Sequence, residues 1–363
     1  MLQENFTRLD TALHQDYSLS LPVDDAQEII KGAVYGLSSS EKKLLIDSGL
    51  WPTDKPMTLE KWDERLEKLW YQLFYKGKNA DLYLIPDTSP IEVLMVRSDR
   101  TSVFNIKLDL EIEWKGEIQT QISKFGAQFV EDRWFPTCFT NLPDNIPESL
   151  RNRCQSMELC KPLTMEIDGE EKWLELIFRN YSTWSFHELY SEWKDPYELD
   201  ISEWMKQWDK FENPIFTPTT KDSDDTPIAS HLVRRKFPDI INKLEALFAE
   251  FTAYMYDRWY IVIDTKVEVF MSGGFAKLWD EIFTPESSRF IKIEDFEAGN
   301  YISADKQIIR NLGEEFWWKD RLEEILKLNH KAEKKLAVSD EVSSRKRQEL
   351  LDGYSDIYSA MQK

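Results

Sequence analysis

The sequence predicts an α+β fold with two lobes, built from antiparallel sheets with packed helices. Short β-rich runs such as LYLIP, IEVLMVR and VFNIKLDLEIEW follow one another between residues 73 and 170, which is typical of an antiparallel sheet. Apolar residues recur at near-helical spacing between residues 232 and 254, which indicates a core helix rather than a ligand-binding segment. A chain of 363 residues with 42% hydrophobic content is ample for a large core or for two lobes.

One stretch carries charge where an ordinary core strand carries apolar side chains. Alternation along VIDTKVEVF places two carboxylates and an ammonium group on one face of a strand, those of Asp264, Lys266 and Glu268. The Ser-Gly-Gly sequence that follows favours a turn, so we expect residues 276–281 to return as the partner strand. A three-residue loop would set Asp280 directly opposite Glu268.

Two interpretations of this charged hairpin compete. Carboxylates on neighbouring strands with a lysine close by suit a magnesium ion that bridges nucleotide phosphates. Alternating charge is also common on solvated antiparallel strands, and the Asp-x-Lys-x-Glu pattern alone favours that simpler interpretation. The following TPESSR adds a Pro turn, two hydroxyls and an arginine, which together can hold a phosphate or a carboxylate. The combination therefore favours a functional site.

The words IDTKVE, DEIFTPESSRF and DKQ, in this order, resemble the signature of the phosphoribosylaminoimidazole-succinocarboxamide synthases, or SAICAR synthetases. The resemblance implies a two-lobed fold related to ATP-grasp. It also implies that ATP and Mg²⁺ are used to join a carboxylated aminoimidazole ribonucleotide to L-aspartate. By resemblance, Glu268 and Asp280 hold the metal and contact ATP, and Asp264 and Lys266 line the reaction centre. Substrate contacts fall on Ser288 and Arg289.

Upstream segments resemble the same family in the correct order. FYKGKNADLY is similar to the nucleotide-binding turn, where Gly77 lets the backbone approach the ATP phosphates and Lys78 adds positive charge. Taken alone, KGK indicates no more than an exposed turn. VLMVRSDRTSVFN resembles the family motif that opens the substrate-binding side of the site, and this motif ends at Asn105. WKGEIQTQIS resembles a second motif, in which Lys115 contacts ATP.

Two further segments carry substrate contacts by resemblance. LIFRNYSTWSFHELY is similar to the stretch in which an arginine and a serine receive the ribonucleotide phosphate, here Arg179 and Ser185. TPTTKDSDDTPI places Lys221 and Asp225 at the family's lysine and aspartate. The resemblance therefore runs from about residue 73 to residue 310, and more weakly to the C-terminus.

Several positions depart from the family pattern, and they gather on the substrate side. The departures are Ala80 for the family's Lys, Asn105 for Asp, Thr120 for Asn, Trp184 for Gly, Glu188 for Arg, Asp224 for His and Glu286 for Asp. A reversed charge such as Glu188 is costly beside an anionic ligand unless the substrate has changed too. We favour a divergent but ordinary purine-biosynthetic enzyme. A paralogue that ligates a different amine or azole carboxylate, and a homologue that binds nucleotide without catalysis, stay open.

The implied mechanism agrees with the residue types. A carboxylate does not form an amide in water without activation, and ATP can convert it to an acyl phosphate. Lys78 would offset phosphate charge, and Arg179, Ser185 and Arg289 would anchor the ribonucleotide. Asp264 is our candidate for orienting the amine or accepting its proton.

Composition agrees with a cytoplasmic enzyme that acts on small molecules. A net charge of −20 argues against binding nucleic acid, which needs a basic surface. The 3 cysteines are odd in number and lack a zinc spacing, as expected for reduced thiols. The start of the chain resembles no signal peptide and no run of about 18 apolar residues occurs, so we expect no membrane insertion. Assembly into a homo-oligomer stays open.

We expect three segments along the chain. Residues 1–65 contain helical patches with capping residues and form a helical N-terminal extension, which we interpret as a cover for one lobe rather than a regulatory module. Residues 66–170 form the β-rich nucleotide-binding lobe. Residues 171–363 form an α+β lobe that binds substrate and metal and ends in helices.

Overall fold

The computed structural model describes most of the chain after the predicted N-terminal extension. The described residues are 66, 69, 71–103, 106–146, 148–191, 195–201, 205–222, 225–301, 303, 335–336, 338 and 342–363. The predicted extension, residues 1–65, lies outside them, and so do Asn105 and Asp224. The backbone of Trp184 and Ser185 is described, but their side chains are not.

The described residues form a mixed α and β structure with antiparallel sheets, as the sequence predicts. They divide into two compact units, each assembled from separate stretches of the chain. The first unit takes its described residues from the stretches up to 121, 138–161 and 309–352. The second takes them from 122–137, 162–308 and 353–363.

The first unit contains an antiparallel five-stranded sheet with the order β1-β2-β3-β7-β6. Its strands are β1 (Gln72–Lys76), β2 (Ala80–Leu84), β3 (Glu92–Arg97), β6 (Phe139–Thr140) and β7 (Cys154–Glu158). Apolar side chains of β2 and β3, among them Tyr83, Leu94 and Val96, form a buried core. A smaller sheet joins β4 (Arg100–Val103), β5 (Ile106–Glu111) and β16 (Lys335–Leu336), and the short helix α6 spans Glu148–Arg151.

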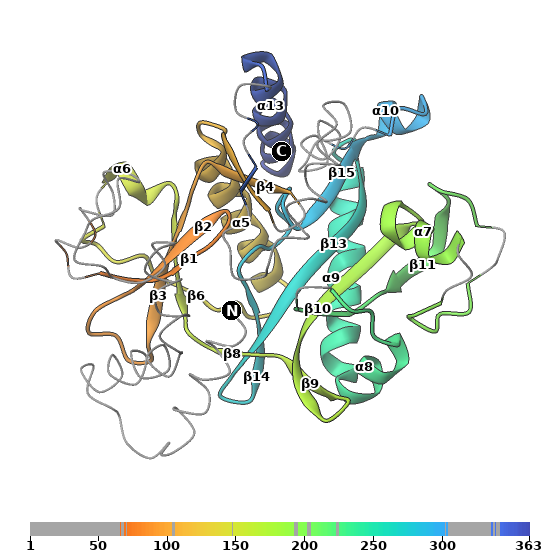
Figure 1. The fold of residues 1–363 in the computed structure, drawn as a ribbon, viewed down its shortest axis with the longest axis horizontal. Coiled ribbons are helices and arrows are strands. Elements are labelled where there is room, and N and C mark those ends of the chain that lie inside the picture. The colour runs from red at the N-terminus through yellow and green to blue at the C-terminus, as the bar shows by residue number, and fades with distance from the viewer. Residues whose placement is uncertain are drawn as a thin grey trace. The chain divides into compact units, whose positions relative to one another are not determined.

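The second unit is built on an eight-stranded sheet with the central order β11-β10-β13-β14 (Figure 1). Strands β9 and β12 pair with β10, and β8 and β15 pair with β13. The bounds are β8 (Lys161–Pro162), β9 (Thr164–Ile167), β10 (Glu170–Tyr181), β11 (Lys210–Phe216), β12 (Thr219–Thr220), β13 (Tyr260–Ser272), β14 (Phe275–Trp279) and β15 (Ser288–Lys292). The charged strand of the sequence is therefore central, with neighbours on both sides.

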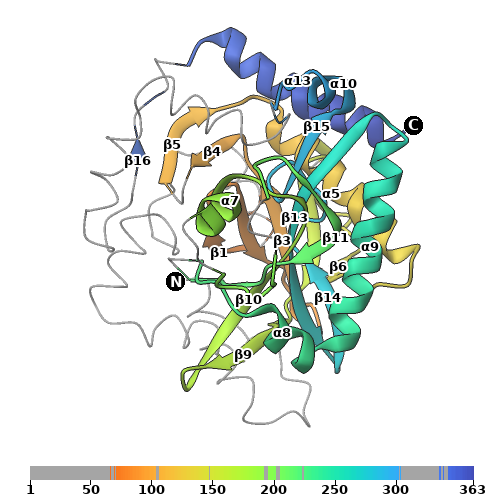
Figure 2. The ribbon, with the colours of Figure 1, turned by 90° about the vertical axis from the view of Figure 1, so that its right-hand side faces the viewer.

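The helix predicted between residues 232 and 254 is two helices, α8 (Ser230–Lys236) and α9 (Pro238–Tyr256). Pro238 stands at the first turn of α9, where its missing N–H costs no hydrogen bond, and so it begins a new helix. The buried residues of α9 recur every three or four positions: Ile241, Leu244, Leu247, Phe248, Phe251 and Met255. Helix α9 contacts β13, and Figure 2 shows the helix running along one side of the sheet.

The other helices are α5 (Lys115–Glu131), α7 (Trp184–Ser191), α10 (Ile293–Glu297) and α13 (Ser344–Met361). Both α5 and α13 contribute residues to the two units. In the second unit the rings of Phe129 and Tyr254 lie 5.4 Å apart, and those of Phe251 and Phe283 stack at 3.8 Å. These aromatic contacts join α5, α9 and the loop after β14 into one core.

The turn of the charged hairpin differs from the expectation. Ser272 pairs with Phe275, so the loop holds two residues, Gly273 and Gly274, whose φ values are +56° and +84°. Positive φ at both positions suits the two-residue hairpin turn and glycine at each of them. The expected three-residue loop was wrong. Trp279 rather than Asp280 lies opposite Glu268, and Asp280 follows the strand end with a φ of +62°.

Helix α5 approaches the loop after Asp280 through a glycine. A Cβ atom added at Gly126 would lie 2.9 Å from the carbonyl carbon of Ile282 and closer still to its oxygen. We therefore expect Gly126→Ala to lower the free energy of unfolding by about 1–3 kcal/mol, the usual cost of overpacking. Urea denaturation of both proteins measures this loss. Gln128→Ala, an exposed change in the same helix, is the control and should stay within about 0.5 kcal/mol of the parent.

Candidate functional site

Three of the predicted site residues meet in one buried cluster of the second unit. Arg179 on β10 pairs across the sheet with Asp264 on β13, and Arg289 on β15 pairs with Asp264 from the other side. The Arg179 guanidinium donates to Asp264 Oδ2 at 2.7 Å, and Arg289 donates to the same oxygen in a short contact. The three neighbouring strands therefore bring two arginines to one carboxylate.

In this cluster, burial disfavours the charged side chains and their ion pairs favour them. Asp264 is 2% exposed and Arg179 is 7% exposed. Burial lowers the pKa of Arg179, and the ion pair with Asp264 opposes this effect. Thr217 accepts a hydrogen bond of 2.9 Å from the Arg179 Nε. Removal of any one charge would leave another buried without full compensation.

A second polar cluster lies further along β10 and β13. The Lys266 Nζ donates to Glu175 Oε1 at 2.8 Å, and the Lys221 Nζ lies 4.0 Å from that oxygen. Lys221 also donates to Glu268 Oε1 in a short contact. Two ammonium groups and two carboxylates therefore alternate in the order Lys266, Glu175, Lys221, Glu268.

The charged groups of this second cluster shift one another's pKa values. Burial by itself lowers the pKa of Lys266, but Glu175 and Glu268 outweigh burial and raise it above its ordinary value. Burial raises the pKa of Glu268, against the effect of Lys221, and the negative charges of Glu175 and Asp280 raise it further. Lys266 therefore keeps its proton firmly, while burial and neighbouring negative charges disfavour the charged form of Glu268 in spite of Lys221.

The oxygen atoms of Glu268 suit a divalent cation. Glu268 Oε2 is buried and, among the described residues, has no hydrogen-bond partner. The negative charge of Asp280 also raises the pKa of Glu268, which indicates a second carboxylate in the neighbourhood. No group of three or more His, Cys, Asp or Glu side chains in the described stretches could hold a metal by itself. Mg²⁺ is commonly held by one or two carboxylates together with substrate phosphates, so this donor set fits it.

Two further predicted substrate residues of the second unit have described side chains, and a third does not. Ser288 is buried and its hydroxyl lies 2.7 Å from that of Thr265. Asp225 is exposed, has a φ of +47° and raises the pKa of Lys266, behind burial, Glu175 and Glu268. Ser185 follows Trp184, the first residue of α7, and neither side chain is among those described.

The predicted ATP contacts of the first unit form a compact turn between β1 and β2. The Gly77 N–H donates to the carbonyl of Ala80, and Arg100 donates to the carbonyl oxygens of Gly77 and Lys78. A Cβ atom at Gly77 would meet the Ala80 backbone, so this turn needs glycine. The buried Lys115 donates from Nζ to the Arg100 carbonyl at 2.9 Å, close to the same turn.

Some departures from the family pattern have local partners in the fold. Thr120 is buried and donates to the carbonyl of Gly116 one turn earlier in α5. Glu286 accepts a hydrogen bond of 2.9 Å from the Tyr354 hydroxyl on α13. Glu188 is exposed on α7. The longer side chain of Glu286 is therefore accommodated by the C-terminal helix.

Glu175 belongs to the site but was not predicted from the sequence. It is 4% exposed and lies four residues before Arg179 on β10, so both side chains share a face. A single glutamate inside the apolar run LELIF was the available signal. Its significance depends on Lys266 and Lys221, which come from other strands.

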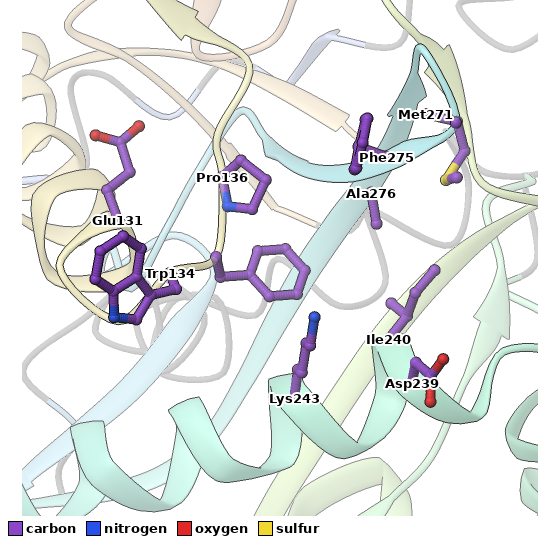
Figure 3. A pocket seen from close by; sticks show the side chains of 11 residues that line it. Glu131, Trp134, Pro136, Asp239, Ile240, Lys243, Met271, Phe275 and Ala276 are labelled. Carbon is purple, nitrogen blue, oxygen red and sulfur yellow. The ribbon is translucent and has the colours of Figure 1, made fainter.

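A pocket of about 720 Å³ in the second unit lies at the hairpin end of β13, near the start of α9 (Figure 3). Trp134, Pro136 and Phe275 form apolar walls, and the Lys243 side chain points into the space. No predicted site residue lines this pocket. The charged clusters, rather than this apolar hollow, therefore form the candidate active site.

Comparison with known proteins decides the family. A family model described as SAICAR synthetase matches residues 73–325, which include all the predicted site residues. The chain belongs to the SAICAR synthetase family. Curated relatives named phosphoribosylaminoimidazole-succinocarboxamide synthase include one from Actinobacillus succinogenes, 32% identical over 264 residues, which cover 67% of this chain and 86% of the relative. Another, from Neisseria meningitidis, is 32% identical over 260 residues, with the same coverage.

Solved structures of SAICAR synthetases share the fold. The Saccharomyces cerevisiae SAICAR synthase, complexed with SAICAR, has a TM-score of 0.61 and 20% identity, covering 85% of this chain and 98% of its own. A type-2 SAICAR synthetase in complex with ADP has a TM-score of 0.53 and 17% identity, covering 79% and 96%. The predicted SAICAR synthetase-like fold is confirmed. In the described part of the chain, no helix combines the length and apolarity needed to cross a bilayer.

Proposed function

We propose that this SAICAR synthetase family member is an ATP-dependent ligase that joins a carboxylated aminoimidazole ribonucleotide to L-aspartate in purine biosynthesis. The observation that carries this function is the convergence of Arg179 and Arg289 on Asp264, beside the cluster around Glu268. Together they supply the anion-binding, acidic and metal-binding groups that the reaction needs. The substrates are small molecules, and we expect a cytoplasmic enzyme whose two-lobed fold is related to ATP-grasp.

The arginine cluster would bind the ribonucleotide phosphate. The side chain of Arg289 is 23% exposed, whereas that of Arg179 is 8% exposed. Arg289 can therefore offer guanidinium donors to a phosphate while Asp264 holds it in place. Arg179, which is more deeply buried, would add positive charge next to Arg289, and Ser185 and Ser288 would be further contacts to the substrate.

The β-rich segment 66–170 would bind ATP. Gly77 allows the backbone of the β1–β2 turn to approach the phosphates, and Lys78 supplies positive charge. Lys115 supports this turn through Arg100. Glu268 and Asp280 would hold Mg²⁺, which when bound neutralises charge on the phosphates.

Amide formation would follow activation of the acceptor carboxylate. Transfer of the γ-phosphoryl group of ATP to this carboxylate would release ADP and give an acyl phosphate. The amine would then attack the acyl carbon, with loss of inorganic phosphate and of the amine proton. Lys266 and Lys221 would attract the carboxylate groups of the substrates, and their ion pairs with Glu175 and Glu268 would hold them in position. Asp264 would orient the amine or accept its proton. Both arginines contact its Oδ2, so the amine would approach Oδ1.

Incubation of purified protein with Mg-ATP, carboxyaminoimidazole ribonucleotide and a panel of amines tests this function. We expect ADP release and a product mass of SAICAR with aspartate alone. Turnover only with another amine would instead support a paralogue, to which Glu188 in place of the family's arginine would point. Nucleotide binding without any turnover would favour a homologue that does not catalyse.

A further inference from the structure

Lys221 occupies one oxygen of the carboxylate that is proposed to hold the metal. Its ammonium group donates to Glu268 Oε1, and the other oxygen, Oε2, is buried without a hydrogen-bond partner among the described residues. An ammonium group in close contact with a carboxylate oxygen occupies the space that a directly bound cation would need. Lys221 and a divalent ion therefore compete for Glu268.

A second carboxylate lies within reach of the same ammonium group. Glu175 Oε1 is 4.0 Å from the Lys221 Nζ, and Lys266 holds that oxygen in position with a hydrogen bond of 2.8 Å. The lysine side chain is flexible, so its ammonium group can turn from one carboxylate to the other without movement of the backbone. Glu175 is 4% exposed and Glu268 is 7% exposed, so both ends of this path are buried.

The backbone of Lys221 is held in place, while its ammonium group can face either of two carboxylates. The Lys221 N–H donates to the Trp173 carbonyl at 2.7 Å, and its ammonium group lies 4.3 Å from the centre of the Trp173 ring. A ring face attracts a cation without dictating which carboxylate it faces. Trp173 can therefore retain the ammonium group in either position.

We propose that Lys221 takes the place of the divalent cation on Glu268 in the ligand-free protein and turns to Glu175 when the cation binds. Glu175 is then a positioning residue that receives the displaced charge. Without it, the displaced ammonium group, on a side chain only 25% exposed, would lose its receiving carboxylate, which is unfavourable. This inference rests on the proposed metal site at Glu268 and Asp280 and assigns to Glu175 and Lys221 the control of its affinity.

A double-mutant cycle read by Mn²⁺ binding tests the exchange. Calorimetric titration with Mn²⁺, without nucleotide, compares the full-length parent with Lys221→Met, Glu175→Gln and the double variant. We expect Lys221→Met to bind Mn²⁺ about tenfold more tightly, because the competing ammonium group is gone. We expect Glu175→Gln to bind about tenfold more weakly, because the displaced ammonium group has lost its receiving carboxylate.

The double variant separates the exchange from simple electrostatics. If Glu175 acts through Lys221, its replacement changes Mn²⁺ affinity by no more than about twofold once Lys221 is Met. Equal weakening in both backgrounds would show that Glu175 is merely a nearby negative charge, and would overturn the proposal. Unchanged affinity in Lys221→Met, or no Mn²⁺ binding by any of the proteins, would overturn it too. Lys172→Met, which removes an exposed ion pair with Glu170, is the control and should leave the affinity unchanged.

Cross-linking of the parent protein provides a readout that needs no folded variant. A carbodiimide joins an amine to a contacting carboxylate, and Glu175 and Glu268 fall in different tryptic peptides. We expect the cross-link from Lys221 to shift from Glu268 to Glu175 as Mn²⁺ is added, and persistence on Glu268 at saturation would contradict the exchange.

Turnover with aspartate tests the ligase separately. Full turnover with additive Mn²⁺ effects would overturn only the exchange, and non-additive effects without turnover would overturn only the ligase.

Discussion

Asp264→Asn is expected to reduce amide formation at least about 100-fold while changing ATP affinity by less than about threefold. Asparagine keeps the shape of the side chain but can neither accept the amine proton nor neutralise Arg179 and Arg289. Product mass per unit time measures amide formation, and calorimetry with a non-hydrolysable ATP analogue measures binding. An equal loss of both would refute the role of Asp264 at the amine.

The same change should also destabilise the protein. Arg179 is buried, and loss of the negative charge beside it is expected to cost about 3–5 kcal/mol of unfolding free energy. Activity must therefore be measured below the lowered melting temperature. Glu245→Gln is the control, because it removes a partly buried ion pair between Glu245 on α9 and Arg234 on α8, outside the charged clusters. The control should lose some stability but keep the parent's rate per folded molecule.

Glu268→Gln is expected to reduce turnover about a thousandfold and to abolish Mn²⁺ binding. The amide offers one weak oxygen ligand where the carboxylate offers two charged ones. Steady-state ADP release and Mn²⁺ titration measure the two losses. Glu166→Gln, an exposed change on β9 of the same sheet, should alter neither.

Stability should not fall together with activity in Glu268→Gln. The pKa of Glu268 is raised in the folded protein, so its contribution to stability is present at low pH and is lost as pH rises through its raised pKa. The charged form of Glu268 therefore opposes folding, and glutamine removes this cost. We expect the melting temperature at pH 7 to be equal to or above that of the parent. A large drop in the melting temperature would indicate a structural rather than a metal-binding role.

The charged face of β13 could be predicted because side-chain alternation is a local property of a strand. Asp264, Lys266 and Glu268 share a face whichever strands lie beside them. The position of Asp280 could not be predicted in the same way, since it depends on the turn. Two glycines with positive φ shortened the loop by one residue and moved Trp279 to the place opposite Glu268.

The role of Glu175 could not be predicted because its partners are distant in the sequence. Lys266 lies 91 residues further along the chain, and it reaches Glu175 because β10 and β13 pair in one register. A shift of that register by one residue would turn the charged side chains of one strand to the opposite face. The pairing of Arg179 with Asp264 depends on the same register.

The sequence by itself determined the family, the antiparallel character of the sheets and the set of charged residues available for chemistry, because motifs and periodicity are local. Which charges neutralise one another was determined by the packed sheet. Strand register selected Asp264 as the shared partner of two arginines and placed Glu175 between two lysines. Burial then made those pairings important for stability and reactivity, because a charge removed from water is neutralised only by its immediate neighbours.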